Sequence, residues 1–110
     1  MAGFLVRVAM LIAIAALCVS GSRAHEWYPA ECCSGNDCAP ISAQAVSETP
    51  DGYVVTIEPG SHPMWPQDGR AALVHVIAYK AARRSQDGRF HICIGASGYL
   101  FCFYAAVGGV

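Results

Sequence analysis

Two segments near the middle of the chain carry the apolar and turn residues of a β-hairpin. Residues 53–58 (YVVTIE) are dominated by β-branched and aromatic side chains, which is typical of a strand. Residues 49–52 (TPDG) form a strong turn sequence, because proline presets φ and glycine accepts a left-handed conformation. With a weaker strand predicted over 41–48, the pattern predicts a hairpin.

A second hairpin is predicted near the carboxyl end, where 90–94 and 99–104 flank the turn sequence at 95–98 (GASG). Successive strand residues face opposite ways. If the last two residues of GASG form the turn, Cys93 lies opposite Cys102 on one face of the hairpin. The other face then becomes a core of large apolar side chains: Phe90, Ile92, Ile94, Phe101 and Phe103.

The segments between the hairpins are less regular. Residues 59–69 (PGSHPMWPQDG) hold three prolines and two glycines, and this density of breakers predicts an irregular loop. Residues 71–84 fit either a helix, from their alanine-rich flanks, or a strand, from their valine-rich centre. β-Branching favours a strand over 73–78, with a helical turn possible over 79–84.

The first 24 residues have the layout of a secretory signal peptide. Arg7 precedes an uncharged apolar run at 8–19, and Ser-Arg-Ala at 22–24 is a small-x-small site. The run is shorter than the roughly 20 apolar residues of a membrane-spanning helix. We expect cleavage before His25; lipidation of Cys18 and an uncleaved anchor are the alternatives.

Cleavage there would leave a single domain over 25–110, too small to divide into two cores. Of seven basic and eight acidic residues, Arg7 and Arg23 would be lost, leaving a net charge of −3 with histidine neutral. This balance argues against general binding of nucleic acid, which depends on neutralising phosphates. Burial of apolar side chains alone makes a domain of this size only marginally stable, so we expect disulfide bonds to add to its stability.

Five cysteines follow the expected cleavage site, three of them in a polar, turn-rich loop at 25–40. They are Cys32, Cys33, Cys38, Cys93 and Cys102. In an exported protein they predict a disulfide framework with one cysteine left over. A bridge between the neighbours Cys32 and Cys33 would be strained.

Two pairings stay open. Cys93 and Cys102 can bridge each other across the hairpin, or each can reach the amino-terminal loop and strap it over the hairpin face. We favour the strap, because such long loops are each worth about 4 kcal/mol in the chain-entropy model.

Copper is the metal that the residue pattern suggests. A terminal amine at His25 and its own imidazole, joined by His62, His75 or His91 and by Met64, would supply ligands that suit this ion. The cysteine spacing lacks the C-x2-4-C pairs of structural zinc sites. Acidic neighbours of the cysteine-rich loop disfavour a reactive thiolate. With no catalytic motif recognisable, we predict that the protein is not an enzyme.

Four large side chains in the two irregular loops form a candidate binding surface, since aromatic residues dominate interface energetics. They are Trp27, Tyr28, Met64 and Trp65. The alternative is that they cap a small core.

The sequence HEWYPAECCSGNDC (25–38) resembles the start of the mature region in a group of uncharacterised small exported bacterial proteins, with the motif H-x-W-Y-P-x-x-C-C-S-G-x-D-C. HPMWP (62–66), SQDGRFHIC (85–93) and CFYAAVGG (102–109) are similar to later parts of those proteins. The resemblance implies export from a Gram-negative type of cell. It supplies no activity and no catalytic residue.

The sequence therefore predicts an all-β, disulfide-stabilised domain after a signal peptide, with a meander or barrel-like sheet of about five strands. The expected role is that of a periplasmic or secreted module that binds a protein or an envelope component through the loops at 25–40 and 59–69. Copper handling and a thiol-redox accessory role are the alternatives. No stable membrane insertion is expected after cleavage.

Overall fold

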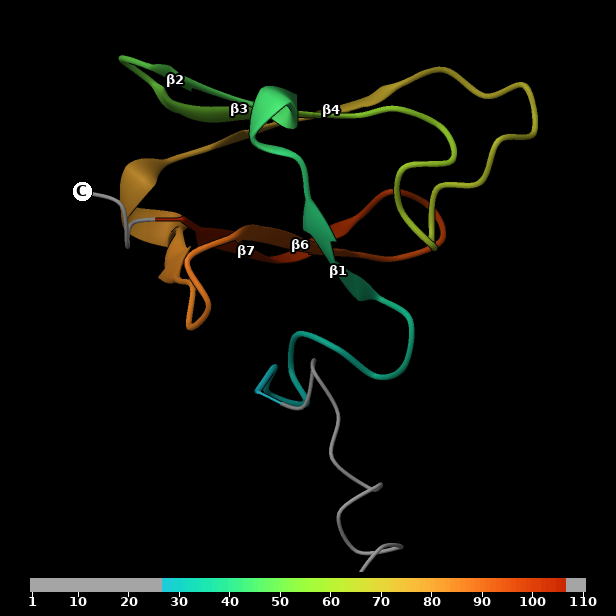
Figure 1. Cartoon of the computed structure of the whole chain (residues 1–110). Helices are drawn as coiled ribbons and strands as arrows, with labels where there is room; N and C mark the ends of the chain where they lie inside the picture. The colour runs from blue at the N-terminus through green and yellow to red at the C-terminus, as the bar shows by residue number, and fades with distance from the viewer. Residues whose placement is uncertain (1–26, 107–110) are drawn as a thin grey trace, which may run out of the picture.

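The computed structural model describes residues 27–106, which form two stacked β-sheets (Figure 1). One sheet has the strand order β1-β6-β7-β5 and the other has β2-β3-β4. All strand pairs are antiparallel except β5 with β7. The strands are β1 (Cys38–Ile41), β2 (Val46–Thr49), β3 (Gly52–Ile57), β4 (Leu73–Ile77), β5 (Arg83–Arg84), β6 (Phe90–Ile94) and β7 (Leu100–Ala105). The predicted all-β domain is confirmed.

The strands are more numerous than the sequence suggested, with seven in two sheets across residues 27–106 instead of about five in one. The segment predicted as one strand over 41–48 contributes to both sheets. Its middle forms a 3-10 turn, η1 (Ala43–Ala45), where the side chain of Ser42 accepts a hydrogen bond from Gln44 N at 3.2 Å. This cap ends β1 and carries the chain across to β2.

The first predicted hairpin is confirmed as β2 and β3, which close on the pair Thr49 and Gly52. Strand β4 pairs with the other side of β3, so the strand interpretation of the ambiguous segment is also confirmed. The helical turn predicted over 79–84 is one 3-10 turn, η2 (Tyr79–Ala81), followed by β5.

The second hairpin has the predicted pairing of Cys93 with Cys102, but its tip differs from the prediction. A register shift after Cys93 places Ile94 opposite Leu100, so the connection is longer than a two-residue turn. The extra residue of this bulge removes Phe101 from the core face. Phe101 is 45% exposed, and its predicted place in the core was wrong.

Apart from the first residue of β6 and from Leu100 and Phe101 of β7, strands β6 and β7 are buried on both faces. Between the two sheets lies the main core, formed by Tyr53, Val55, Ile57, Ile77, Ile92, Ile94, Phe103 and Ala105. On the other face, the amino-terminal loop packs over a second cluster, formed by Tyr28, Cys32, Cys38, Cys93, Cys102 and Tyr104. In Figure 1 this loop lies on the side of β1, β6 and β7 that faces away from the β2-β3-β4 sheet.

The predicted signal peptide (1–24) and the expected new terminus at His25 lie outside the described residues. Within residues 27–106, no helix has the length and apolar character needed to cross a membrane.

Candidate functional site

Two disulfides fasten the amino-terminal loop and β1 to the central hairpin. Cys32 is bonded to Cys102, 70 residues away, and Cys38 to Cys93, 55 residues away. This is the strap arrangement. Cys93 has a cysteine opposite it on each neighbouring strand, Cys38 on β1 and Cys102 on β7. The sequence predicted only the second neighbour, because Cys38 was assigned to the loop at 25–40.

Cys33 is the free cysteine of the described residues. Its side chain is half-buried beside the second cluster, and its thiol lies 3.2 Å from Gly35 O. The predicted leftover cysteine is therefore the residue next to a bridged one.

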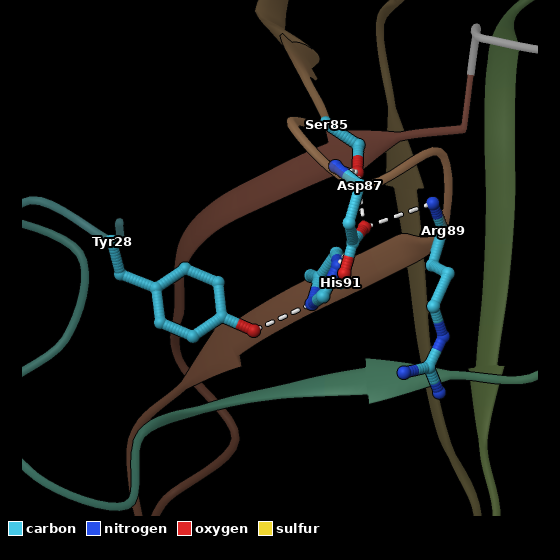
Figure 2. A network of polar contacts seen from close by, with 5 residues as sticks. All are labelled: Tyr28, Ser85, Asp87, Arg89 and His91. Atoms are coloured by element: carbon cyan, nitrogen blue, oxygen red, sulfur yellow. Dashed lines mark hydrogen bonds and ion pairs between the residues drawn. The ribbon is translucent and has the colours of Figure 1, made fainter. Parts of the chain in front are cut away.

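A tyrosine–histidine–aspartate network connects the same loop to β6 (Figure 2). The Tyr28 hydroxyl lies 2.5 Å from Nδ1 of His91, and His91 Nε2 lies 2.8 Å from Oδ1 of Asp87. Because Nε2 donates a hydrogen bond to the carboxylate, Nδ1 is the atom that accepts a hydrogen bond from the Tyr28 hydroxyl. Both nitrogens of His91, a side chain only 3% exposed, are thus engaged within the protein.

Asp87 is the last residue of the network, on the side of His91 opposite to Tyr28. Burial raises the pKa of Asp87, but hydrogen bonds from His91, Ser85 and the Arg89 backbone outweigh this and bring the pKa to about 2. Burial, with the Asp87 charge adding to it, raises the pKa of Tyr28 to about 12. Tyr28 therefore stays a neutral hydrogen-bond donor and is poorly suited to be a nucleophile.

Trp27 covers this network from outside. Its ring centroid lies 4.8 Å from that of His91 and 4.9 Å from that of Tyr104, both edge to face. Together with the disulfides, these contacts fix the position of the loop. The network therefore has a structural role: both ring nitrogens of His91 are hydrogen-bonded within the protein, so neither is free to contact a substrate.

The Asp87 network predicts acid sensitivity. The folded pKa of Asp87 lies below its ordinary value of 3.8, so its contribution to stability is complete above about pH 4 and is lost as pH falls toward 2. We expect Asp87→Asn to remove part of this loss, measured as the change in urea midpoint between pH 5 and pH 2.5. The matched control is Asp51→Asn in an exposed turn. If the two variants have the same pH dependence as the wild type, the network does not contribute.

The other histidines predicted as metal ligands also have protein partners. In the buried His62, Nε2 lies 2.9 Å from Ile92 O and Nδ1 accepts a hydrogen bond from Met64 N at 3.0 Å. His75 Nε2 lies 2.8 Å from Gly98 O. Across residues 27–106, no three His, Cys, Asp or Glu side chains come together as a metal site. With His25 outside that range, copper binding stays a prediction.

The four side chains of the candidate binding surface are divided between two places. Trp27 and Tyr28 pack on the second cluster, with Tyr28 buried. Met64 and Trp65 pack against the main core, and Trp65 Nε1 donates to Ala71 O at 3.0 Å. Since these clusters lie on opposite faces of β6 and β7, the four residues do not form one surface.

The large exposed apolar side chains of residues 27–106 lie elsewhere. They are Val74 (54% exposed), Val76 (62%), Tyr79 (45%), Tyr99 (66%) and Phe101 (45%). The hydrogen bond between His75 and Gly98 holds the tip of the β6–β7 hairpin against the inner face of β4, whereas Val74 and Val76 lie on the outer face. The rings of Tyr99 and Phe101 lie 5.4 Å apart. We define the β4 surface as the edge of β4 left unpaired in the described part of the chain, together with the side chains of Val74 and Val76.

Sequence reasoning missed this surface. Its signal was the run at 73–77 (LVHVI), in which apolar residues occupy both faces of a strand. We interpreted this run only as a strand. In a strand at the end of a sheet, apolar residues on the second face stay exposed and can contact a partner.

Comparison of the chain with known protein families, curated proteins and solved structures finds no match. The function is therefore argued from geometry.

Proposed function

We propose that this protein is a small exported binding module, periplasmic or secreted, that holds a partner polypeptide on the β4 surface. The observation that carries the proposal is the open outer edge of β4, flanked by the exposed side chains of Val74 and Val76. Among residues 27–106, no strand pairs with that edge.

The disulfides support a location outside the cytoplasm. Bridges such as Cys32–Cys102 and Cys38–Cys93 persist in oxidising compartments and are rare where thiols are kept reduced. The signal-peptide pattern at 1–24 points to the same export route.

Strand β4 differs from the other strands at the ends of the described sheets. Proteins protect such edges with proline, charge or very short strands. Strand β1 contains Pro40, β2 contains Glu48, and β5 is two arginines long. Strand β4 has neither proline nor Asp, Glu, Lys or Arg. It is the edge most open to an added strand.

The exposed side chains of β4 suit the same role. In strand addition, main-chain hydrogen bonds supply affinity and side-chain contacts supply specificity. The open edge of β4 offers the first, and Val74 and Val76, both more than half exposed, offer apolar side chains for the second.

The test is photo-crosslinking in cells that export the full chain. A photoreactive amino acid at position 76 is expected to give a discrete adduct with a polypeptide, and Val74→Lys is expected to reduce its yield about tenfold, since a buried unpaired charge is costly. The control places the same amino acid at the exposed Ser47 of β2. An identical adduct pattern at 47 and 76, or a yield unchanged by Val74→Lys, would contradict the proposal.

A further inference from the structure

Strand β4 is nearly symmetric in sequence about His75, reading Leu-Val-His-Val-Ile over 73–77. An interface with twofold symmetry requires a surface that is complementary to itself. If two copies of β4 pair antiparallel with His75 at the centre, Val74 of each copy lies opposite Val76 of the other. Each exposed valine side chain then lies opposite an exposed valine side chain of the other copy.

The backbone of β4 suits the same register. Thr49 and Gly52 flank the two-residue turn between β2 and β3, and residues that flank such a turn form a hydrogen-bonded pair. The even-numbered residues of β3 therefore direct their N–H and C=O groups to β2, and the odd-numbered residues direct theirs to β4. The odd-numbered residues of β4 are their partners. Val74 and Val76 therefore direct N–H and C=O groups to the open edge. Pairing centred on His75 joins all of these groups to their equivalents in the second copy.

We infer that the polypeptide held on the β4 surface is a second copy of this chain, joined by antiparallel β4–β4 pairing centred on His75. This inference rests on the proposed function and names its partner. The result is a continuous six-stranded sheet, from β2 of one copy to β2 of the other.

No charged side chain of β4 opposes the pairing of two copies. Neither Val74 nor Val76 is charged. Of the charges nearest in sequence, Arg70 is held by Asp68 at 2.6 Å, and Lys80 lies in η2 after the strand has ended. Because the interface uses the β4 edge of both copies and the opposite edge contains Glu48, assembly stops at two.

The area available predicts a weak dimer. A fully buried aromatic side chain removes roughly 150–250 Å² from water, and a valine is smaller. Val74 and Val76, exposed by 54% and 62%, therefore have only part of that smaller area left to bury. The total is well below the about 800 Å² that each partner buries in a stable interface. We therefore expect a reversible dimer that forms as concentration rises.

Sedimentation velocity of the purified exported protein, from about 10 µM to 1 mM, tests the inference, since weak dimers populate in this range. We expect the mass to rise toward that of a dimer. Val74→Lys with Val76→Lys should weaken the dimer about tenfold or more, because the introduced ammonium groups would face one another. Ser47→Lys, an equal charge on β2, should leave it unchanged. Both valines are more than half exposed, so the variants should keep the wild-type near-ultraviolet circular dichroism.

The crosslinking probe at position 76 separates the two proposals. In the pure protein it should give an adduct of two chains. A monomer at every concentration, combined with an adduct to a different polypeptide in cells, would overturn the second copy as partner and leave the proposed function standing. A monomer with no adduct in cells would overturn both. A dimer that the two lysines do not weaken would place the interface elsewhere and also contradict the inference.

Discussion

Replacing Cys38 and Cys93 together by serine is expected to lower the free energy of unfolding by about 2–5 kcal/mol. Their bridge joins β1 to β6 across 55 residues of sequence. A domain of this size is stable by only about 5–10 kcal/mol. The variant therefore loses a large share of its stability, which urea unfolding without reductant would measure against the wild type.

The matched control is Cys33→Ser in the same loop. Cys33 is free, so its replacement should change the free energy of unfolding by less than about 0.5 kcal/mol, as at most surface sites. Equal losses in the two variants, or a wild-type midpoint for the double variant, would show that the strap does not hold this domain together.

Gly52→Ala is expected to destabilise the protein by about 3 kcal/mol or more, because the added methyl group meets the backbone. Gly52 has φ of 132°, and a Cβ built there would lie 2.2 Å from Ile77 O of β4. The clash involves main-chain atoms of two strands, so no side-chain rotation relieves it.

Gly69→Ala separates the clash from the backbone conformation. Gly69 also has a positive φ, 93°, but a Cβ there would meet nothing within 4 Å. Its replacement should cost about 1 kcal/mol from conformational strain alone. Equal urea midpoints for the two variants would mean that the turn can move away from β4, contrary to the packing described above.

Local patterns in the sequence predicted much of the fold. β-Branched and aromatic content with the TPDG turn located the first hairpin, and the pairing of Cys93 with Cys102 followed from strand periodicity. Residues 38–40 of β1 were missed because they include Pro40 and are too few to show a period. Phe101 was misplaced because a bulge adds a residue that no two-residue period reveals.

The site was less accessible to such reasoning. Strand periodicity places His91 on the same face as Cys93, opposite Tyr104, as the structure has it. The partner Tyr28, 63 residues away, could not be predicted, because only the folded chain brings the amino-terminal loop onto that face. The openness of β4 depends on its place at the end of a sheet, which is a property of topology. The cysteine framework was more predictable, because export and an odd count already imply bridges with one thiol left over.

Disulfide mapping of the exported protein tests the central claim, that two bridges strap the amino-terminal segment onto one face of the hairpin. Free thiols are blocked first, the unreduced protein is digested, and linked peptides are identified by mass spectrometry. The account predicts Cys32 linked to Cys102, Cys38 linked to Cys93, and the blocking group on Cys33. A peptide linking Cys93 to Cys102, or Cys33 in either bridge, would contradict it.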